Sequence, residues 1–569
     1  MSEVSSAEIA VTQQVERSKI SSEKSHWFER FNETCSEWCS SILVKETRQA
    51  LKSRQFIWTY IVLLVCVGVW TVIGLTFSGN SYQIGPTLLI GFFMILGFPL
   101  AVIIPFSAYR SLAREFEDGT ISLISITTMK PYQIVIGKFG SAVLQMMIYL
   151  SVLAPCICCT YLLRGVSIDQ IWAVLAMCVG GSIALTILGL FLAGVFRSKT
   201  LGVGVSVLFV LFIGWLYVLW CILCNEFFSY GNPMDWNEDG VQEITFLIIA
   251  LVGSTALLLL VAAVSQISFA ADNRSSKVRI GMLVQQMLFF AFIILILGYT
   301  LFDRESFIVA VYFAGHYWLL MGFLMIGESS TISRRVQRTL PRTFFSRSFF
   351  SLLMPGAGRG YLFAAANVLA CSICLCAIWW FGPQLVTQAE FKRAASRWGA
   401  RAVPLASEQI LACAVSSIYV LWFLSIVYLI VKRLEKRKRE WGPGIGPMVS
   451  LLIGALLVAT LSIGGMVIHF NTTNFPRDPS IWLVFNWHWT TWDIGDDNVM
   501  FGSQVVWIFF FVIQALLVTI IAMVIASKEL LCKPIAVPER VAIETEKKHP
   551  KQSLPPGESI DEIFGEVKN

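Results

Sequence analysis

The sequence predicts an all-α, polytopic integral membrane protein with about twelve transmembrane helices and both termini in the cytoplasm. Hydrophobic residues make up 56% of the 569 residues and charged residues only 14%, which is more apolar than a water-soluble core of this length requires. The apolar residues gather in long runs, and the basic residues gather on one side of those runs. This composition excludes a soluble enzyme, a fibrous protein and a wholly disordered chain.

Twelve stretches are long enough to cross a bilayer, which takes about 20 mainly apolar residues in a helix. In the first half they cover residues 56–77, 84–108, 134–163, 171–196, 201–224 and 244–270, and in the second half residues 280–302, 307–326, 361–381, 409–431, 446–470 and 503–527. With the spans alternating in direction and the N-terminus inside, 36 of the 43 Lys and Arg residues lie on the cytoplasmic side. Basic residues favour the cytoplasmic loops, so this orientation is the expected one.

The spans divide the chain into four parts. Residues 1–35 form a polar segment without a cleavable signal sequence, so the first span is expected to direct insertion. Residues 36–272 and 273–527 each hold six spans with a similar order of long and short loops, which suggests a diverged internal repeat. Residues 36–55 predict an amphipathic helix on the membrane surface, with Ile42 and Leu43 dipping into the interface. Residues 528–569 are polar and rich in proline, which predicts a disordered cytoplasmic tail.

Charged residues are almost absent from the centres of the spans, where each would cost roughly 2.5 to 3.5 kcal/mol on insertion scales. His316 alone lies well inside a span, where we expect it to hydrogen-bond to a neighbouring helix. This scarcity disfavours transport coupled to ions that move through the helices. The ionisable residues nearest the spans lie at predicted helix ends, where they are expected to reach water: Lys138, Asp303, Glu328, Glu408 and His469.

Sequence motifs for catalysis are absent. The chain has no Walker A loop, HExxH, GxSxG or paired cytoplasmic CxxC motif. The glycine-rich segment 354–360 lacks the strand and Lys of a phosphate-binding loop, so it is interpreted as a flexible turn with Arg359 at the lipid surface. The cysteines fall mainly within spans and are interpreted as apolar fillers, with a disulfide or soft-metal site at Cys221 and Cys224 as the alternative. We therefore expect no catalytic residue, bound metal or cofactor in this chain.

The cytoplasmic loop between the second and third spans, residues 114–138, has the clearest internal pattern. Acidic residues precede Gly119, which permits a sharp turn, and Thr120 is placed to cap a short helix with an apolar surface. Pro131 is expected to end that element, and Lys138 to anchor the next span at the headgroups. A short, partly apolar element between two spans suits docking into a groove on a soluble partner. The residues expected in this docking element are Glu115, Glu117, Gly119, Thr120, Ile121, Leu123, Ile124, Pro131 and Lys138.

This loop resembles the permease subunits of type 2 ATP-binding cassette (ABC) transporters over about residues 36–270. The family pattern is E-x-E-x-GT, a leucine run, a Thr/Pro-rich turn and an apolar stretch ending in GK; Ser122, Met129 and Lys130 depart from it. The resemblance implies that residues 114–138 form the coupling loop that binds a separate nucleotide-binding subunit, which would hold ATP and Mg²⁺. It also implies an exporter in a bacterial cytoplasmic membrane, in which the chain pairs with itself or a paralogue, or its second half replaces the partner.

Two kinds of polar segment remain. The basic and aromatic segments of the second half are interpreted as lipid-surface anchors rather than nucleic-acid sites; the anchoring residues are Arg334, Arg335, Arg338, Arg342, Lys436 and Arg437. The outer segments 225–243 and 471–502 combine acidic residues with Trp487, Trp489 and Trp492, and are interpreted as an aromatic belt with solvated acids.

Two other function classes remain open. A secondary transporter with twelve spans has the right helix count, but it lacks the charged residues that ion coupling usually needs. A membrane scaffold or assembly protein that transports nothing is the second alternative.

Overall fold

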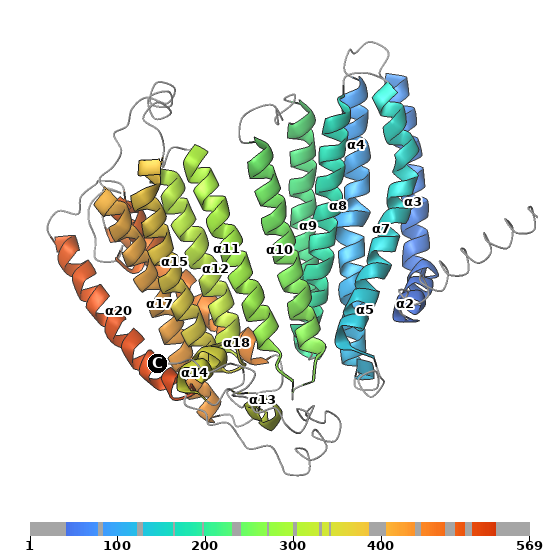
Figure 1. The fold of residues 1–569 in the computed structure, drawn as a ribbon. Helices are drawn as coiled ribbons and strands as arrows, with labels where there is room; N and C mark the ends of the chain where they lie inside the picture. The colour runs from blue at the N-terminus through green and yellow to red at the C-terminus, as the bar shows by residue number, and fades with distance from the viewer. Residues whose placement is uncertain are drawn as a thin grey trace, which may run out of the picture.

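The computed structural model describes residues 41–77, 84–121, 129–162, 166–195, 199–229, 241–269, 272–299, 304–328, 333–338, 340, 343–385, 406–437, 445–472, 484–495 and 503–530. Within these ranges the regular structure is entirely helical (Figure 1). The helices of the first half are α2 (Ser41–Leu51), α3 (Arg54–Phe77), α4 (Ile84–Phe98), η1 (Pro99–Ile103), α5 (Ile104–Glu117), α7 (Pro131–Leu162), α8 (Ile168–Val195), α9 (Lys199–Ser229) and α10 (Val241–Ile267). Those of the second half are α11 (Ser275–Tyr299), α12 (Arg304–Ile326), α13 (Arg334–Arg338), α14 (Phe344–Leu352), α15 (Ala357–Leu385), α17 (Ala406–Arg437), α18 (Ile445–Thr472), α19 (Trp487–Gly495) and α20 (Ser503–Ser527).

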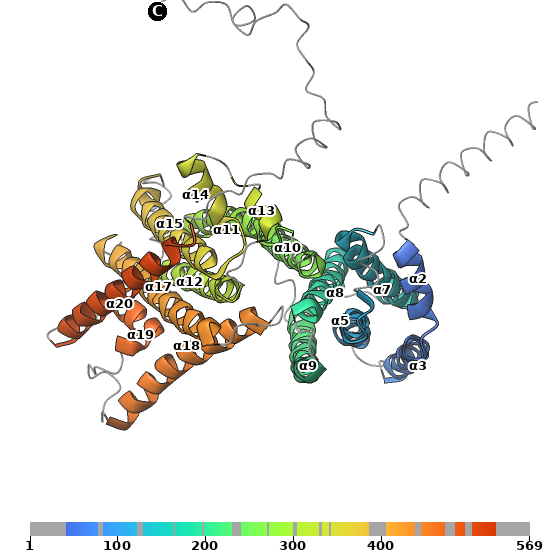
Figure 2. The ribbon, with the colours of Figure 1, turned by 90° about the horizontal axis from the view of Figure 1, so that it is seen from below.

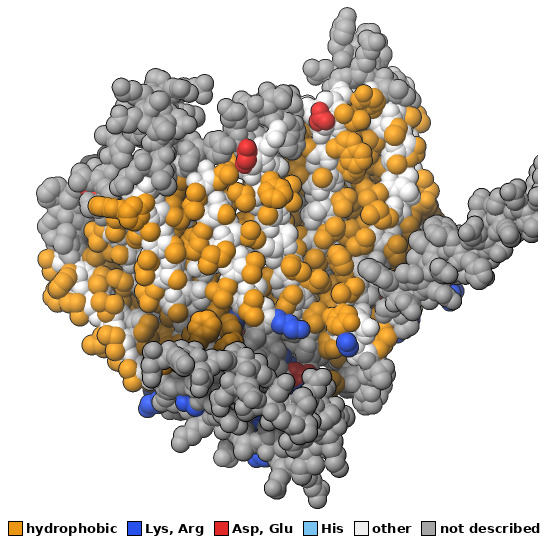
Figure 3. Space-filling view, viewed as in Figure 1, with side chains coloured by type: hydrophobic (Ala, Val, Ile, Leu, Met, Phe, Trp, Pro, Cys, Tyr) orange, Lys and Arg blue, Asp and Glu red, His pale blue; other side chains and the backbone are white. Residues whose placement is uncertain are grey.

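Twelve of these segments are long and apolar enough to cross a membrane, which confirms the predicted fold class. Eleven of them coincide with the predicted stretches apart from a few residues at their ends. The second span, formed by α4, η1 and α5, continues to Glu117, nine residues beyond its predicted end. Hydrophobic side chains cover the sides of the helices, and Lys and Arg gather toward one end (Figure 3). The chain is therefore an integral, multi-pass membrane protein.

Each half of the chain packs around its own apolar core. The first core is built from α3 to α10, and the second from α10 to α20. Viewed along the helices, the two groups meet where α10 lies beside α11 (Figure 2). Polar side chains add to this contact, because Gln285 of α11 donates to Thr255 of α10 at 2.5 Å and accepts from Tyr317 of α12 at 3.0 Å.

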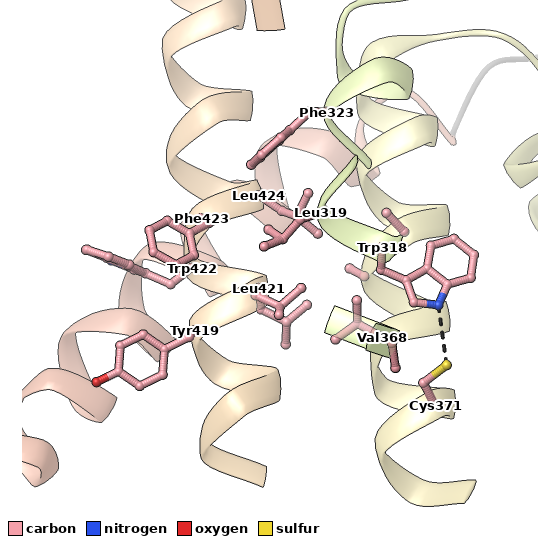
Figure 4. Packing of buried hydrophobic residues seen from close by; sticks show 14 of the residues in the cluster. Trp318, Leu319, Phe323, Val368, Cys371, Tyr419, Leu421, Trp422, Phe423 and Leu424 are labelled. Atoms are coloured by element: carbon pink, nitrogen blue, oxygen red, sulfur yellow. Dashed lines mark hydrogen bonds between the residues drawn. The ribbon is translucent and has the colours of Figure 1, made fainter. Parts of the chain in front are cut away.

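Helix α17 is the central helix of the second core and the most buried of the twelve spans. Its aromatic residues Tyr419, Trp422 and Phe423 face neighbouring helices, and Leu421 and Leu424 point toward Leu319 and Phe323 of α12 (Figure 4). The Trp318 indole N–H donates to the Cys371 sulfur at 3.3 Å. This cysteine and the other ten described ones, Cys221 and Cys224 included, form no disulfide bond.

The residue that follows α12, Gly327, lies close to the start of α18 at Gly446. A Cβ added at Gly446 would lie 2.1 Å from the carbonyl oxygen of Gly327, which is a backbone atom. One turn along α18, the Ser450 hydroxyl donates to the Phe323 carbonyl at 2.6 Å. Small residues permit this close contact between helices in lipid, where packing replaces the hydrophobic effect.

Gly446→Ala is expected to destabilise the protein by about 1–3 kcal/mol, because the new methyl group forces α12 and α18 apart. The measurement is the temperature of unfolding of the purified protein in detergent. Gly464→Ala on the same helix is the control, since a Cβ there meets no atom within 4 Å. Equal unfolding temperatures for the two variants would contradict the close contact.

Candidate functional site

Lys138 is the centre of a buried ion-pair cluster at the end of the bundle where α2, α13 and α14 lie, here called the loop end (Figure 1). Its Nζ lies 2.9 Å from Glu115 Oε1 and 3.1 Å from Glu46 Oε1. The same Nζ donates to the Ser111 hydroxyl at 2.7 Å, and that hydroxyl donates to Glu46 Oε2 at 3.1 Å. The Lys138 side chain is only 2% exposed. The expectation that Lys138 anchors at the headgroups and reaches water is therefore wrong: two carboxylates satisfy it inside the protein.

This cluster joins three elements that are separate in the sequence. Glu46 belongs to α2, Glu115 to the last turn of α5, and Lys138 to the second turn of α7. Helix α2 can lie against α7 because Gly137 and Gly140 leave room for it. Added Cβ atoms at these glycines would come within 2.8 Å of the Ile42 and Leu43 side chains, respectively. Ile42 and Leu43 therefore pack on α7. The prediction that they insert into the membrane interface is wrong.

The turn after α5 forms at Gly119 as predicted, whereas the Thr120 hydroxyl bonds back to α5, and its expected role in capping the next helix stays a prediction. Gly119 has φ +68°, a left-handed conformation that glycine adopts without strain. The Thr120 hydroxyl donates back to the Glu115 carbonyl at 3.2 Å, and Ile121 packs partly on the first core. Glu117 is exposed in the last turn of α5. Pro131 is the first residue of α7, where its missing N–H leaves no hydrogen bond unmade. Leu123 and Ile124 of the predicted docking surface lie outside the described residues.

The second span contains a π-helical turn, η1, upstream of this loop. Its Leu100 carbonyl accepts a hydrogen bond from Ser182 of α8 at 2.6 Å. Gly189, further along α8, lies against the start of α5, since an added Cβ would be 2.9 Å from the Pro105 carbonyl oxygen. A π-helical turn is a place where a helix bends, and such turns are frequent at functional sites.

A second buried cluster lies at the loop end of the second half of the chain. Arg279 of α11 is fully buried, and its Nη2 lies 2.7 Å from Glu328 Oε2. Its Nη1 donates to the carbonyls of Leu352 at 2.5 Å and Met354 at 2.7 Å. Glu328 in turn accepts from the Gly356 N–H at 3.1 Å. This arginine therefore fixes the segment that leads into α15.

Glu529 holds the same glycine-rich segment from the other side. Its carboxylate accepts from the Gly358 N–H and from Lys432 Nζ, both at 2.8 Å, and its carbonyl accepts from Arg359 Nη2 at 2.6 Å. Arg359 is 2% exposed. Two sequence expectations are corrected: Arg359 lies inside the protein and not at the lipid surface, and segment 354–360 is clamped by two carboxylates. Residues 528–530 also belong to the folded part and not to the tail.

The predicted lipid-surface anchors are described only in part. Arg334 and Arg335 are exposed on α13, and Arg335 pairs with Asp272 at 2.9 Å. Arg338 ends the same helix and is half-buried. Arg342 and the side chains of Lys436 and Arg437 lie outside the described residues. Anchoring to lipid stays a prediction.

His316 has a partner that sequence analysis missed. Its Nε2 lies 3.1 Å from Nε2 of His488, and its Nδ1 lies 2.8 Å from the Tyr312 carbonyl. Because a carbonyl only accepts, Nδ1 of His316 carries a hydrogen, and the two Nε2 atoms share a second hydrogen bond between the rings. The expected hydrogen bond to a neighbouring helix is confirmed. The residues are 172 positions apart, and no local pattern connects them.

Helix α19 carries His488 into the bundle. Trp487 is fully buried and donates to the Ser416 hydroxyl at 2.9 Å, and its ring lies where Gly315 leaves space on α12. Trp487 therefore does not belong to the expected aromatic belt; Trp492 is 40% exposed. The signal available in the sequence was the small residue Gly315 beside His316, which marks a close approach by another element.

The comparisons with known proteins leave the family open. No protein-family model matches the chain. No curated protein and no solved structure is significantly similar to it either. Among the described residues, no group of three or more His, Cys, Asp or Glu side chains is arranged to hold a metal ion. We therefore take the ion-pair cluster at Lys138 as the candidate site, because two of its residues, Glu115 and Lys138, belong to the loop that the sequence singles out.

Proposed function

We propose that this protein is the permease subunit of an ATP-driven ABC exporter, with ATP hydrolysis in a separate nucleotide-binding subunit. The observation that carries the proposal is the ion pair between Glu115 and Lys138. It joins the two ends of the loop that resembles the coupling loop of type 2 ABC permeases. The ion pair thereby links the last turn of α5 to α7, on either side of this loop.

Such a tether transmits movement. A partner that binds residues 118–130 acts on α5 and α7 through the ion pair, and on α2 through Glu46. The π-helical turn at Pro99–Ile103 gives the second span a place to bend. Nucleotide-driven closure of an ATPase against this loop would then rearrange the first six spans as a unit.

The proposal also includes the orientation of the protein in the membrane, the type of membrane and the source of a second transport core. The loop end faces the cytoplasm, where the basic residues gather, and the membrane is a bacterial cytoplasmic membrane. Arg334 and Arg335 on α13 are exposed at the loop end, where they suit contact with anionic lipid headgroups. Two transport cores are supplied by pairing with a second copy or a paralogue, or by the second half of the chain.

The test is affinity purification of the full-length chain from its native cell in mild detergent. A variant with Gly119→Pro and Leu123→Asp is compared with wild type, because proline cannot adopt the φ of +68° at this position. Gly119→Asn is the matched control, since Asn tolerates positive φ. We expect an ABC ATPase and its activity to co-purify with wild type and the control, and to be lost with the double variant.

Other outcomes would overturn the proposal. If no ATPase co-purifies with any of the three proteins while they stay folded, the permease assignment fails. Transport driven by an ion gradient without nucleotide would then favour the secondary transporter, for which the His316–His488 pair is the supporting observation. An ATPase that is stimulated in the absence of any substrate flux would favour the scaffold.

A further inference from the structure

A crevice between α18 and α19 lies at the depth of the membrane. It has a volume of about 430 Å³ and is lined by Ser462, Ile463, Met466, Val467, Asn486 and His488. Ser462 stands ten residues before the end of α18, about 15 Å along the helix. The candidate membrane span of this helix is Gly446–Ile468, so the lining residues from Ser462 to Val467 occupy the last third of that span.

The lining combines a lipid-facing wall with a polar end. Ile463 and Val467 are 63% and 51% exposed, as expected for side chains that face acyl chains. Asn486 directly precedes α19 and His488 lies in its first turn, so this short helix supplies the polar end of the lining. Irregular backbone and polar side chains are tolerated at such a depth where they are buried in protein or line a cavity.

One hydroxyl in the crevice has unused hydrogen-bonding capacity. The Ser462 Oγ is buried and makes no hydrogen bond within the part of the chain that the structure describes. The neighbouring Asn486 amide is bonded elsewhere: its Nδ2 donates to the Ser462 carbonyl at 3.1 Å, and its Oδ1 accepts from the Trp489 N–H at 3.2 Å. A buried hydroxyl without a partner costs about 1–3 kcal/mol, so a ligand that supplies one gains that energy.

The chemistry of the lining selects the head group of such a ligand. None of the six lining residues is Lys, Arg, Asp or Glu, so an ionised carboxylate or phosphate would be buried there without a counter-ion. His488 is the only lining residue with a titratable side chain, and its Nε2 lies 3.1 Å from Nε2 of His316. A hydroxyl both donates and accepts, and therefore matches both Ser462 and the imidazole of His488.

We propose that this crevice binds a neutral, hydroxyl-bearing amphiphile that enters sideways from the bilayer, its head group on Ser462 and His488 and its chain along Ile463 and Val467. The cavity volume lies within the range of ordinary small-molecule sites, roughly 300–1,000 Å³. The site is distinct from the loop end, and it does not depend on an ATPase partner.

The test is photo-crosslinking of the full-length protein in nanodiscs with a monoacylglycerol that carries a diazirine in its acyl chain. We expect the label on the α18 peptide that contains residues 462–467. Unlabelled monoacylglycerol is expected to displace the probe at about tenfold lower concentration than palmitate, which is anionic, or hexadecane, which has no head group. Ser462→Ala is expected to weaken displacement by monoacylglycerol about 3- to 10-fold, the value of one hydrogen bond.

Leu456→Ala is the matched control, because Leu456 lies on the same helix, is 63% exposed and does not line the crevice. It should leave labelling and displacement unchanged. Labelling that spreads evenly along α18 and resists competition would identify ordinary annular lipid and overturn the proposal. Stronger displacement by palmitate than by monoacylglycerol would overturn the neutral head group.

Discussion

Lys138→Met is expected to lower the free energy of unfolding by about 3–5 kcal/mol, because removing one partner leaves buried charges uncompensated. Glu46 and Glu115 have side chains only 11% and 16% exposed, and both would then lie in a site without a cation. They would repel each other and separate α2 and α5 from α7. The measurement is the unfolding temperature of the purified full-length chain in detergent.

Two controls separate the cluster from a general effect of removing charge. Lys130→Met removes an exposed lysine from the same loop and is expected to change stability by less than about 0.5 kcal/mol. Glu46→Gln combined with Lys138→Met removes one of the two stranded carboxylates and should recover part of the loss. Full stability of the single variant, or no recovery in the double variant, would contradict a shared cluster.

The twelve spans could be predicted from the sequence because each one is an apolar run of the required length. The turn at Gly119 could be predicted for a similarly local reason: acidic residues, glycine and a hydroxyl residue follow one another. In both cases the signal and the structure occupy the same few residues. The structure accordingly has the predicted helices and the left-handed glycine.

The partners of the ionisable residues could not be predicted in this way. Lys138 lies near a helix end, which in the sequence is typical of a headgroup anchor. In the fold it pairs with Glu46, which lies 92 positions earlier in the chain. Glu529 looks like part of a polar tail until its carboxylate meets Gly358, 171 positions away. Hydrophobic periodicity places helices along the chain, but it does not say which helix ends meet. The buried pairs depend on that packing.

Glycine was the signal that sequence analysis underused. Gly137, Gly315 and Gly358 each leave room for a distant residue: Ile42, Trp487 and Glu529, respectively. Each of these glycines lies beside or near an ionisable residue whose surroundings were predicted wrongly or incompletely. A small residue next to a polar one near a span marks a place where another element comes close.

Arg279→Met is the second change for which we expect a large effect, again a loss of about 3–5 kcal/mol in the free energy of unfolding. The guanidinium is fully buried and donates to Glu328 and to two backbone carbonyls, those of Leu352 and Met354. Methionine fills similar space but leaves one carboxylate and two carbonyls without these donors. Lysine is not an equivalent replacement, because a single ammonium lacks the planar fork that reaches these acceptors.

Arg335→Met is the matched control, since Arg335 also pairs with a carboxylate but its side chain is 76% exposed. Water and salt screen that pair, and its loss is expected to cost at most about 1 kcal/mol. The two variants therefore remove the same chemical group from a buried and an exposed ion pair at the same end of the bundle. A fall in unfolding temperature several times larger for Arg279→Met would show that Arg279 holds the start of α15 in place. Similar falls for both variants would contradict that role, because they would show that the hydrogen bonds from Arg279 to the Leu352 and Met354 carbonyls add no stability.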